Sequence, residues 1–313
     1  MADFRNLIET ITAAVDRFNS SIPATQRAML REVMQLVKEL DTRGDRIKVT
    51  AENIRRLASI NSKLQRVMLT DNYLASVKEY LGAFTEVVKL QNQYFASVEQ
   101  KFKPPRLLKE LRKQAVEAVA NQLTENGLNS NVVDKGSELI RKAVSTGGSY
   151  NSLSKQLTDF IVNNESGEGQ LLRYTKQIST DALNQFSGQY TQLISSDLGF
   201  EWFRYSGSNI ETSRPFCLAC TDRKFFHISE LPKVLRGEFD DFKKYQGKMN
   251  PKTKLPTGMI PGTDVNNFMT NRGGYNCGHQ WRPVTETLVP EPVVLRVKNS
   301  EEYKAWAKVN KAA

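Results

Sequence analysis

The chain has 313 residues, more than one typical domain, so we expect two structural units. Hydrophobic residues make up 39% and charged residues 25% of it, a balance that still supports a buried core. No run approaches the roughly 18 apolar residues of a membrane-spanning helix, and the first ten residues include acidic side chains. We therefore expect a soluble, unsecreted protein without a membrane partner. Three cysteines exclude a disulfide scaffold and suit a reducing compartment.

Positive charge exceeds negative charge in this chain. Lysine and arginine number 44 against 34 acidic residues, for a formal net charge of +10, and the excess is larger toward the C-terminus. Such an excess permits contact with nucleic-acid phosphates. No helix-turn-helix or zinc-finger pattern accompanies it, so we expect any contact with double-stranded DNA to be independent of base sequence.

The first hundred residues predict helices, because they contain only one proline and two glycines. Apolar side chains recur every three or four residues over 26–40 and again from Asn53. We expect Thr70 to cap a third, longer helix. The apolar residues of that helix follow a coiled-coil-like spacing, which only Gln91 interrupts. We call this stripe the seam; its members are Leu74, Val77, Leu81, Phe84, Val88, Phe95, Val98 and Phe102.

Two interpretations of the seam stay open. The helices can form a hairpin that packs on itself, or the seam can dock on another subunit or partner. Pro104 and Pro105 should end the third helix, because neither can donate a backbone hydrogen bond. We therefore expect a long helical arm over residues 1–105, with the seam as its candidate docking surface.

After the two prolines, the pattern predicts a mostly helical α+β protein. Helices are expected over 106–198, followed by an aromatic, alternating strand at 200–205 and a region rich in glycine and proline. A short strand at 293–297 and a helix at 301–309 should close the chain. The predicted division is an arm at 1–105, a second domain at 106–287 with its β-containing Cys/His region at 199–287, and a C-terminal strand and helix at 288–313.

All three cysteines and both histidines lie in two short segments. Cys217 and Cys220 are separated by two residues, a spacing that allows both thiolates of a tight turn to reach one metal. Cys277 and His279 flank a glycine. Three sulfurs and one nitrogen are a typical ligand set for a structural zinc ion, which would pin the intervening loop.

Other interpretations of these residues remain. The cysteines can be buried free thiols, or Cys217 and Cys220 can form a disulfide. His227 is the spare histidine. It can replace His279 as a ligand, but we expect it to be a structural residue or to support a metal ligand through a hydrogen bond.

Several segments around these residues resemble the phage head morphogenesis family of the phage Mu minor head protein F type. The resemblance covers about half of the chain and excludes the first hundred residues. Gly278 stands where the closing turn of the family usually has arginine, and the Arg-Thr-Glu often seen in its helical part is absent. The matching residues and segments are Leu172, 175–184, Gly199, Trp202, 213–217, Phe225 and 273–284.

The resemblance implies a C-terminal domain similar in fold to ADP-ribosyltransferases. Those enzymes generally use Glu-x-Glu or Gln-x-Glu, and residues 150–313 contain neither motif, so we expect no enzymatic activity. The best enzyme alternative is a zinc-containing HNH-like nuclease associated with DNA packaging. If His279 binds the metal, only His227 remains as its general base.

The resemblance further implies a minor capsid protein of a tailed phage, with a structural role in head morphogenesis. Its expected partners are the portal protein, the major capsid protein, copies of itself and packaged double-stranded DNA. We expect the protein to be assembled in the cytoplasm of the bacterial host and to reside in the virion, inside the capsid or at the portal vertex.

Overall fold

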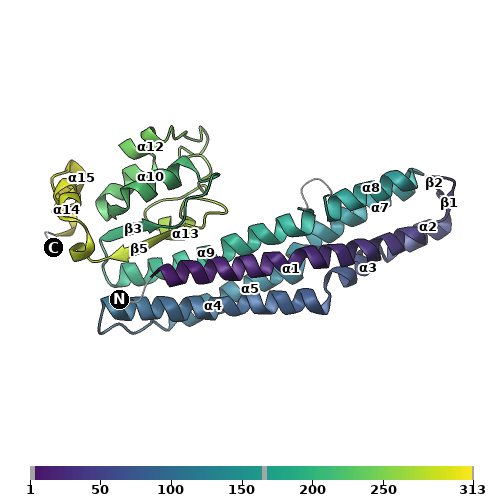
Figure 1. Ribbon diagram of the computed structural model, residues 1–313, viewed down its shortest axis with the longest axis horizontal. Coiled ribbons are helices and arrows are strands. Elements are labelled where there is room, and N and C mark those ends of the chain that lie inside the picture. The colour runs from purple at the N-terminus through teal and green to yellow at the C-terminus, as the bar shows by residue number, and fades with distance from the viewer. Residues whose placement is uncertain (1–3, 164–167, 312–313) are drawn as a thin grey trace. The chain divides into compact units, whose positions relative to one another are not determined.

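A computed structural model describes residues 4–163 and 168–311 and is mostly helical, with two small antiparallel sheets (Figure 1). The prediction of a mostly α, α+β protein is therefore confirmed. The helices of the described residues are α1 (Phe4–Lys38), α2 (Ala51–Ala58), α3 (Ile60–Met68), α4 (Asp71–Val98), α5 (Leu107–Thr124), α6 (Asn126–Leu128), α7 (Asp134–Ser145), α8 (Tyr150–Ile161), α9 (Gln170–Asp197), α10 (Pro215–Arg223), α11 (Leu231–Leu235), α12 (Asp240–Lys244), α13 (Phe268–Asn271), α14 (Glu291–Lys298) and α15 (Glu301–Asn310). The strands are β1 (Thr42–Arg43), β2 (Arg46–Ile47), β3 (Trp202–Ser206), β4 (Phe225–His227) and β5 (Gln280–Val284).

The chain forms two compact units. The Cys/His unit comprises Met1–Thr12, Phe84–Arg112 and Thr180–Ala313, and the helical unit comprises Ala13–Ala83 and Lys113–Ser179. This division differs from the predicted boundary after Pro105. The reason is that α1, α4, α5 and α9 each contribute residues to both units, which proline positions alone do not reveal.

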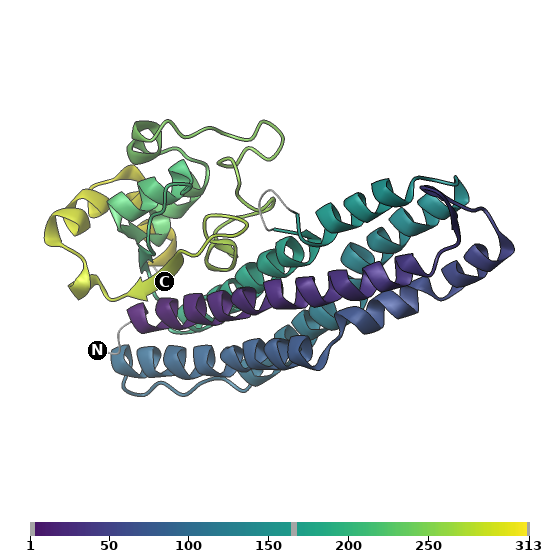
Figure 2. The same ribbon diagram turned by 45° about the vertical axis from the view of Figure 1, so that its right-hand side comes forward.

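The helical unit is built from long helix segments together with α2, α3, α7 and α8 (Figure 2). Phe18 of α1 stacks on Tyr80 of α4, with ring centroids 5.1 Å apart. The Tyr80 hydroxyl donates a 2.6 Å hydrogen bond to the Ser179 carbonyl, and the Tyr73 hydroxyl donates a 2.8 Å bond to the Leu123 carbonyl. Buried tyrosines thus keep their polar ends paired within the unit.

The Cys/His unit is organised around a three-stranded antiparallel sheet with the order β4-β3-β5. Trp202 of β3 lies opposite His227 of β4 and opposite Val284 of β5. One face of this sheet contributes Phe203 and Tyr205 to an apolar cluster of the unit, which also includes residues of α10 to α13. The predicted strand at 200–205 is therefore confirmed as β3.

The strand predicted at 293–297 is wrong, because these residues belong to α14. Three valines and one leucine favoured a strand by propensity. However, Pro292 lies in the first turn of α14, where its fixed φ angle suits a helix. As part of this helix, Val297 is buried in one apolar cluster with Trp202 and Val284.

The seam is buried only in part. Val77, Phe84 and Phe95 are buried, whereas Leu74 is 39% exposed. Leu81, Val88, Val98 and Phe102 are half-buried. The buried face of α4 instead follows Tyr73, Val77, Tyr80, Phe84, Val87, Gln91 and Tyr94. The buried face differs from the aliphatic stripe because it includes tyrosines whose hydroxyls are hydrogen-bonded. The residues of this buried face pack against other parts of the same chain.

Gln91 is fully buried in the Cys/His unit. Its side-chain nitrogen is paired, whereas its Oε1 has no hydrogen-bond partner among the described residues. Its Nε2 donates to the carbonyl and the hydroxyl of Ser187 and to the hydroxyl of Thr191, over 2.8, 3.0 and 2.8 Å. We expect Gln91→Leu to lower the free energy of unfolding by about 1 to 3 kcal/mol, because it removes these hydrogen bonds at a buried position. Urea unfolding checks this value.

The matched control is Gln93→Leu, on the exposed side of the same helix, which should change the stability by less than about 0.5 kcal/mol. Combining Gln91→Leu with Ser187→Ala should cost less than the sum of the two single changes, because both ends of one hydrogen bond are then removed. Equal effects of Gln91→Leu and Gln93→Leu would contradict the prediction.

Among the described residues, no helix combines the length and the apolar character needed to cross a membrane.

Candidate metal centre

Three segments of the Cys/His unit bring the candidate ligands together. Helix α10 begins with Pro215, which places Cys217 in its first turn. Residues 273–279 form a loop that leads into β5 and carries Cys277 and His279. Strand β3 pairs with β5 and carries Tyr205, whose hydroxyl lies beside the sulfurs of Cys217 and Cys277.

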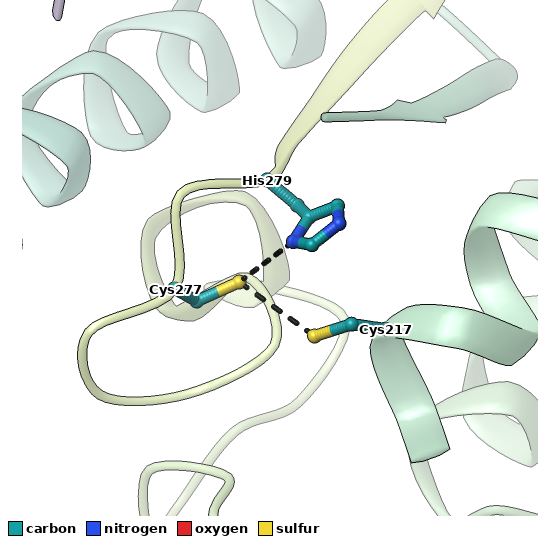
Figure 3. Close-up of side chains that lie close together, drawn as sticks. All are labelled: Cys217, Cys277 and His279. Carbon is teal, nitrogen blue, oxygen red and sulfur yellow. Dashed lines mark hydrogen bonds between the residues drawn. The ribbon is translucent and has the colours of Figure 1, made fainter. Parts of the chain in front are cut away.

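Cys217, Cys277 and His279 form a compact buried group, with one donor atom of each within 4.8 Å of the others (Figure 3). The sulfur of Cys277 lies 3.8 Å from that of Cys217 and 3.6 Å from Nδ1 of His279. The three residues are 2%, 3% and 6% exposed, respectively. This group could hold a metal ion.

The distances fit a tetrahedral zinc ion. With Zn–S bonds of about 2.3 Å and a Zn–N bond of about 2.0 Å, two sulfurs lie about 3.8 Å apart, and a sulfur and a nitrogen lie about 3.5 Å apart. His279 is also oriented as a ligand, because its Nε2 lies 3.2 Å from the side-chain oxygen of Asn209. A hydrogen bond at that nitrogen leaves the lone pair of Nδ1 directed toward the sulfurs.

Tyr205 provides the fourth group next to the two sulfurs. Its hydroxyl lies 3.4 Å from the sulfur of Cys217 and 3.6 Å from that of Cys277, and its ring stacks on His279 with centroids 5.2 Å apart. Burial raises the pKa of Tyr205 well above its ordinary value, so the hydroxyl keeps its proton. The group that lies next to the three donors is therefore a neutral hydroxyl and not a third thiolate.

Cys220 lies outside this group, which corrects the predicted Cys3His set. The expected tight turn is instead helix α10, on which Cys220 is fully buried in the apolar cluster. All three cysteines are free, so the alternative of a disulfide between Cys217 and Cys220 is also wrong. A two-residue gap brings two thiolates to one metal in a knuckle-like turn. On α10 the two cysteines lie about one turn apart along the helix, and only the Cys217 sulfur is among the converging donors.

His227 does not join the cluster either. It is fully buried in β4, where Nδ1 lies 2.8 Å from the Ser229 hydroxyl and accepts from the backbone N–H of the same residue. Its ring packs against Trp202 and Trp306 at centroid distances of 5.0 and 4.8 Å. These contacts match the structural role that we expected, and this burial does not favour His227 as a general base for an external substrate.

The two cysteines influence each other's pKa in opposite directions. Hydrogen bonding with Cys217, assisted by His279 and by the positive charge of Arg272, holds the pKa of Cys277 well below its ordinary value, although burial opposes this shift. The same hydrogen bond, together with burial, raises the pKa of Cys217. The two sulfurs are close enough for a hydrogen bond in which either can be the donor.

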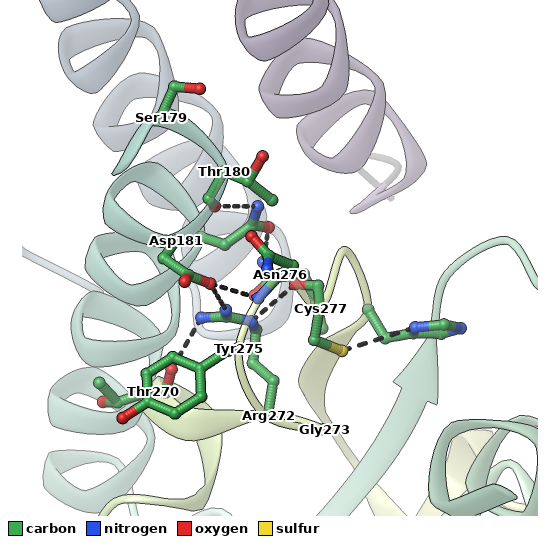
Figure 4. A network of polar contacts seen from close by, with 12 residues as sticks. Ser179, Thr180, Asp181, Thr270, Arg272, Gly273, Tyr275, Asn276 and Cys277 are labelled. Atoms are coloured by element: carbon green, nitrogen blue, oxygen red, sulfur yellow. Dashed lines mark hydrogen bonds and ion pairs between the residues drawn. The ribbon is translucent and has the colours of Figure 1, made fainter. Parts of the chain in front are cut away.

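A buried polar network holds the loop that carries Cys277 (Figure 4). Arg272 is fully buried, and its Nε donates a 3.0 Å hydrogen bond to the Cys277 carbonyl. Asp181 of α9 accepts a 2.6 Å hydrogen bond from the backbone N–H of Asn276 and lies 3.6 Å from Nη2 of Arg272. Burial raises the pKa of Asp181, which Asn276 and Arg272 only partly oppose. The ion pair between Arg272 and Asp181 therefore positions the loop, although removing both charged groups from water costs free energy.

Arg214 and Gly273 complete the loop, and neither was predicted as part of the metal site. Arg214 donates from its two Nη atoms to the carbonyls of Gly273 and Tyr275. A Cβ atom at Gly273 would lie 2.4 Å from the sulfur of Cys217, so only glycine leaves room for the cluster. The paired glycines before Cys277 were the signal for this close approach.

Comparisons with known proteins add no assignment: no family model matches the chain, and neither a curated protein nor a solved structure matches it. The metal-binding interpretation therefore depends on the donor atoms and on their supporting contacts.

Proposed function

We propose that this chain is a structural minor head protein of a tailed phage that docks at the portal or on the inner capsid. The observation that carries the proposal is the convergence of Cys217, Cys277 and His279, which belong to the segments that resemble the head morphogenesis family. Other residues of those segments are also in contact. Gln280 donates a 2.7 Å hydrogen bond to Asn184, and Trp202 lies opposite Val284.

The cluster supports a structural role for the metal in this proposal. Two sulfurs and one imidazole nitrogen are soft or borderline ligands that suit Zn²⁺. Cys217 comes from α10, whereas Cys277 and His279 come from the loop before β5, so a bound ion would tie two distant segments of the chain together. By the same resemblance, we propose an ADP-ribosyltransferase-like fold without catalysis for the Cys/His unit.

In the proposed role, the protein contacts packaged DNA through its net positive charge, without reading base sequence. The portal or capsid would bind exposed parts of the protein, because most of the buried face of α4 is occupied by the chain itself. Leu74 is the member of the seam that stays exposed and is a candidate contact.

The test is co-sedimentation of the full-length protein with portal rings and with empty capsids of the phage that encodes it. Deleting residues 1–105 is not a suitable variant, because α1 and α4 contribute to both units. We expect binding to the cognate portal or capsid and none to portal rings of an unrelated phage. Leu74→Glu should weaken binding more than Ala75→Glu at the exposed neighbouring position.

The structural proposal is contradicted if the protein binds neither the cognate portal nor the cognate capsid. A plasmid-nicking assay with Mg²⁺ or Mn²⁺ is run alongside. Cleavage that His227→Ala abolishes would favour the nuclease alternative instead. Unchanged binding of Leu74→Glu would remove Leu74 from the docking surface but would leave the proposed role intact.

A further inference from the structure

A pocket on the Cys/His unit, separate from the metal cluster, is lined by three arginines. Its volume is about 290 Å³, near the lower end for small-molecule sites. Arg204 comes from β3, Arg282 from β5 and Arg5 from the start of α1. The other lining residues are Phe4, Ile8, Glu9, Ser206, Gly207 and Ser208. The pocket thus has three basic side chains and one acidic side chain.

Two of the arginines face each other directly. Arg204 and Arg282 are register partners on adjacent antiparallel strands, so their side chains leave the same face of the sheet. Like charges at such a position repel each other and destabilise the pair. An anion between the two guanidinium groups would turn this repulsion into attraction.

Aromatic rings contact both guanidinium groups. Arg204 lies 5.6 Å from the centroid of Phe225, and Arg282 lies 5.8 and 5.9 Å from those of Phe4 and Tyr94. The Nε of Arg204 is buried and has no hydrogen-bond partner among the described residues. A buried charged donor without an acceptor is costly, and an anionic ligand would supply the acceptor.

We propose that this pocket binds a phosphate group. Guanidinium groups offer planar pairs of donors that match phosphate oxygens, and the excess of positive charge matches a group of charge near −2. The hydroxyls of Ser206 and Ser208 add neutral donors at the wall of the pocket. The phosphate belongs either to a DNA backbone or to a free phosphate compound, and the experiment separates these sources.

The first arm measures thermal unfolding of the full-length protein while inorganic phosphate replaces chloride at constant ionic strength. We expect a saturable rise of the melting temperature for the wild type. Arg204→Gln should raise the apparent Kd for phosphate at least about 10-fold, as loss of a charge-assisted contact implies. Arg106→Gln is the matched control, because Arg106 is exposed in the same unit and does not line the pocket.

Arg5→Gln provides a second variant that leaves the sheet untouched, because Arg5 is exposed on α1. It should weaken phosphate binding in the same direction as Arg204→Gln. Without phosphate, Arg204→Gln should melt no lower than the wild type, because it removes the repulsion with Arg282. The inference is overturned if the wild type shows no saturable response, or if Arg204→Gln and Arg5→Gln both bind phosphate as the wild type does.

The second arm measures binding of a short DNA duplex over a series of salt concentrations. If the pocket takes a backbone phosphate, Arg204→Gln weakens duplex binding and lowers the slope of log K against log salt by about 0.9. If duplex binding is unchanged while inorganic phosphate binding falls, a free phosphate compound is the ligand. Both arms use isolated protein, so the result does not depend on the proposed role in the phage head.

Discussion

Replacing Asp181 by Asn is expected to lower the free energy of unfolding by about 3 to 5 kcal/mol, because it removes the carboxylate that pairs with the buried guanidinium of Arg272. The Arg272 side chain is 0% exposed, and that of Asp181 is 12% exposed. Urea unfolding, followed by a signal from the Cys/His unit, measures the change. The asparagine can still accept the hydrogen bond from Asn276, so the effect isolates the charge.

Asp240→Asn is the control for this prediction. It removes the same charge from a side chain that is 100% exposed and lies 3.5 Å from Lys243, so its cost should stay below about 0.5 kcal/mol. The double variant Asp181→Asn with Arg272→Met should cost less than the sum of the single changes, since it leaves no charge unpaired. Similar losses for Asp181→Asn and Asp240→Asn would show that the buried pair does not stabilise the loop.

Zinc should bind at about one ion per chain and stabilise the Cys/His unit. At free zinc about 100-fold above Kd, the expected gain in the free energy of unfolding is about 2.7 kcal/mol. Cys277→Ser and His279→Ala should lose both the metal and this gain, because each removes a donor atom of the group. Elemental analysis and thermal unfolding with and without a chelator provide the measurements.

Cys220→Ala is the informative comparison for the metal prediction. Cys220 is buried as deeply as Cys217, yet it is absent from the group of converging donors, so its loss should leave the zinc content unchanged. Loss of zinc in Cys220→Ala would restore the Cys3His set that the spacing predicted. A wild-type protein that takes up no zinc would show that the cluster consists of buried free cysteines and a histidine without a metal.

Part of the site could be predicted from residue types alone. Cys217, Cys277 and His279 stood out because the chain has few residues with soft donor atoms, and these lie in two short segments. The exclusion of Cys220 could not be predicted, since a two-residue gap fits a knuckle and a helix equally well. Tyr205 and Arg272 carry no local signal, because their roles depend on contacts with residues distant in sequence.

The seam shows the same limit for the fold. The length and periodicity of α4 were predictable from the sequence, but its buried face was displaced from the aliphatic stripe. Tyr73 and Tyr80 are buried because carbonyls of other helices accept their hydroxyls. The strand expected at 293–297 failed for a related reason, because β propensity is weaker than the packing that surrounds Val297.

The sequence by itself determined the helical character of the chain, the position of β3 and the small set of residues able to bind a soft metal. Those properties follow from local periodicity, turn residues and side-chain chemistry, which act over a few positions. Only the tertiary structure decided that the long helices serve two units, that Cys220 leaves the cluster, and that Arg204 faces Arg282. These outcomes depend on burial and pairing between segments far apart in the chain, and such contacts leave no regular pattern in one sequence.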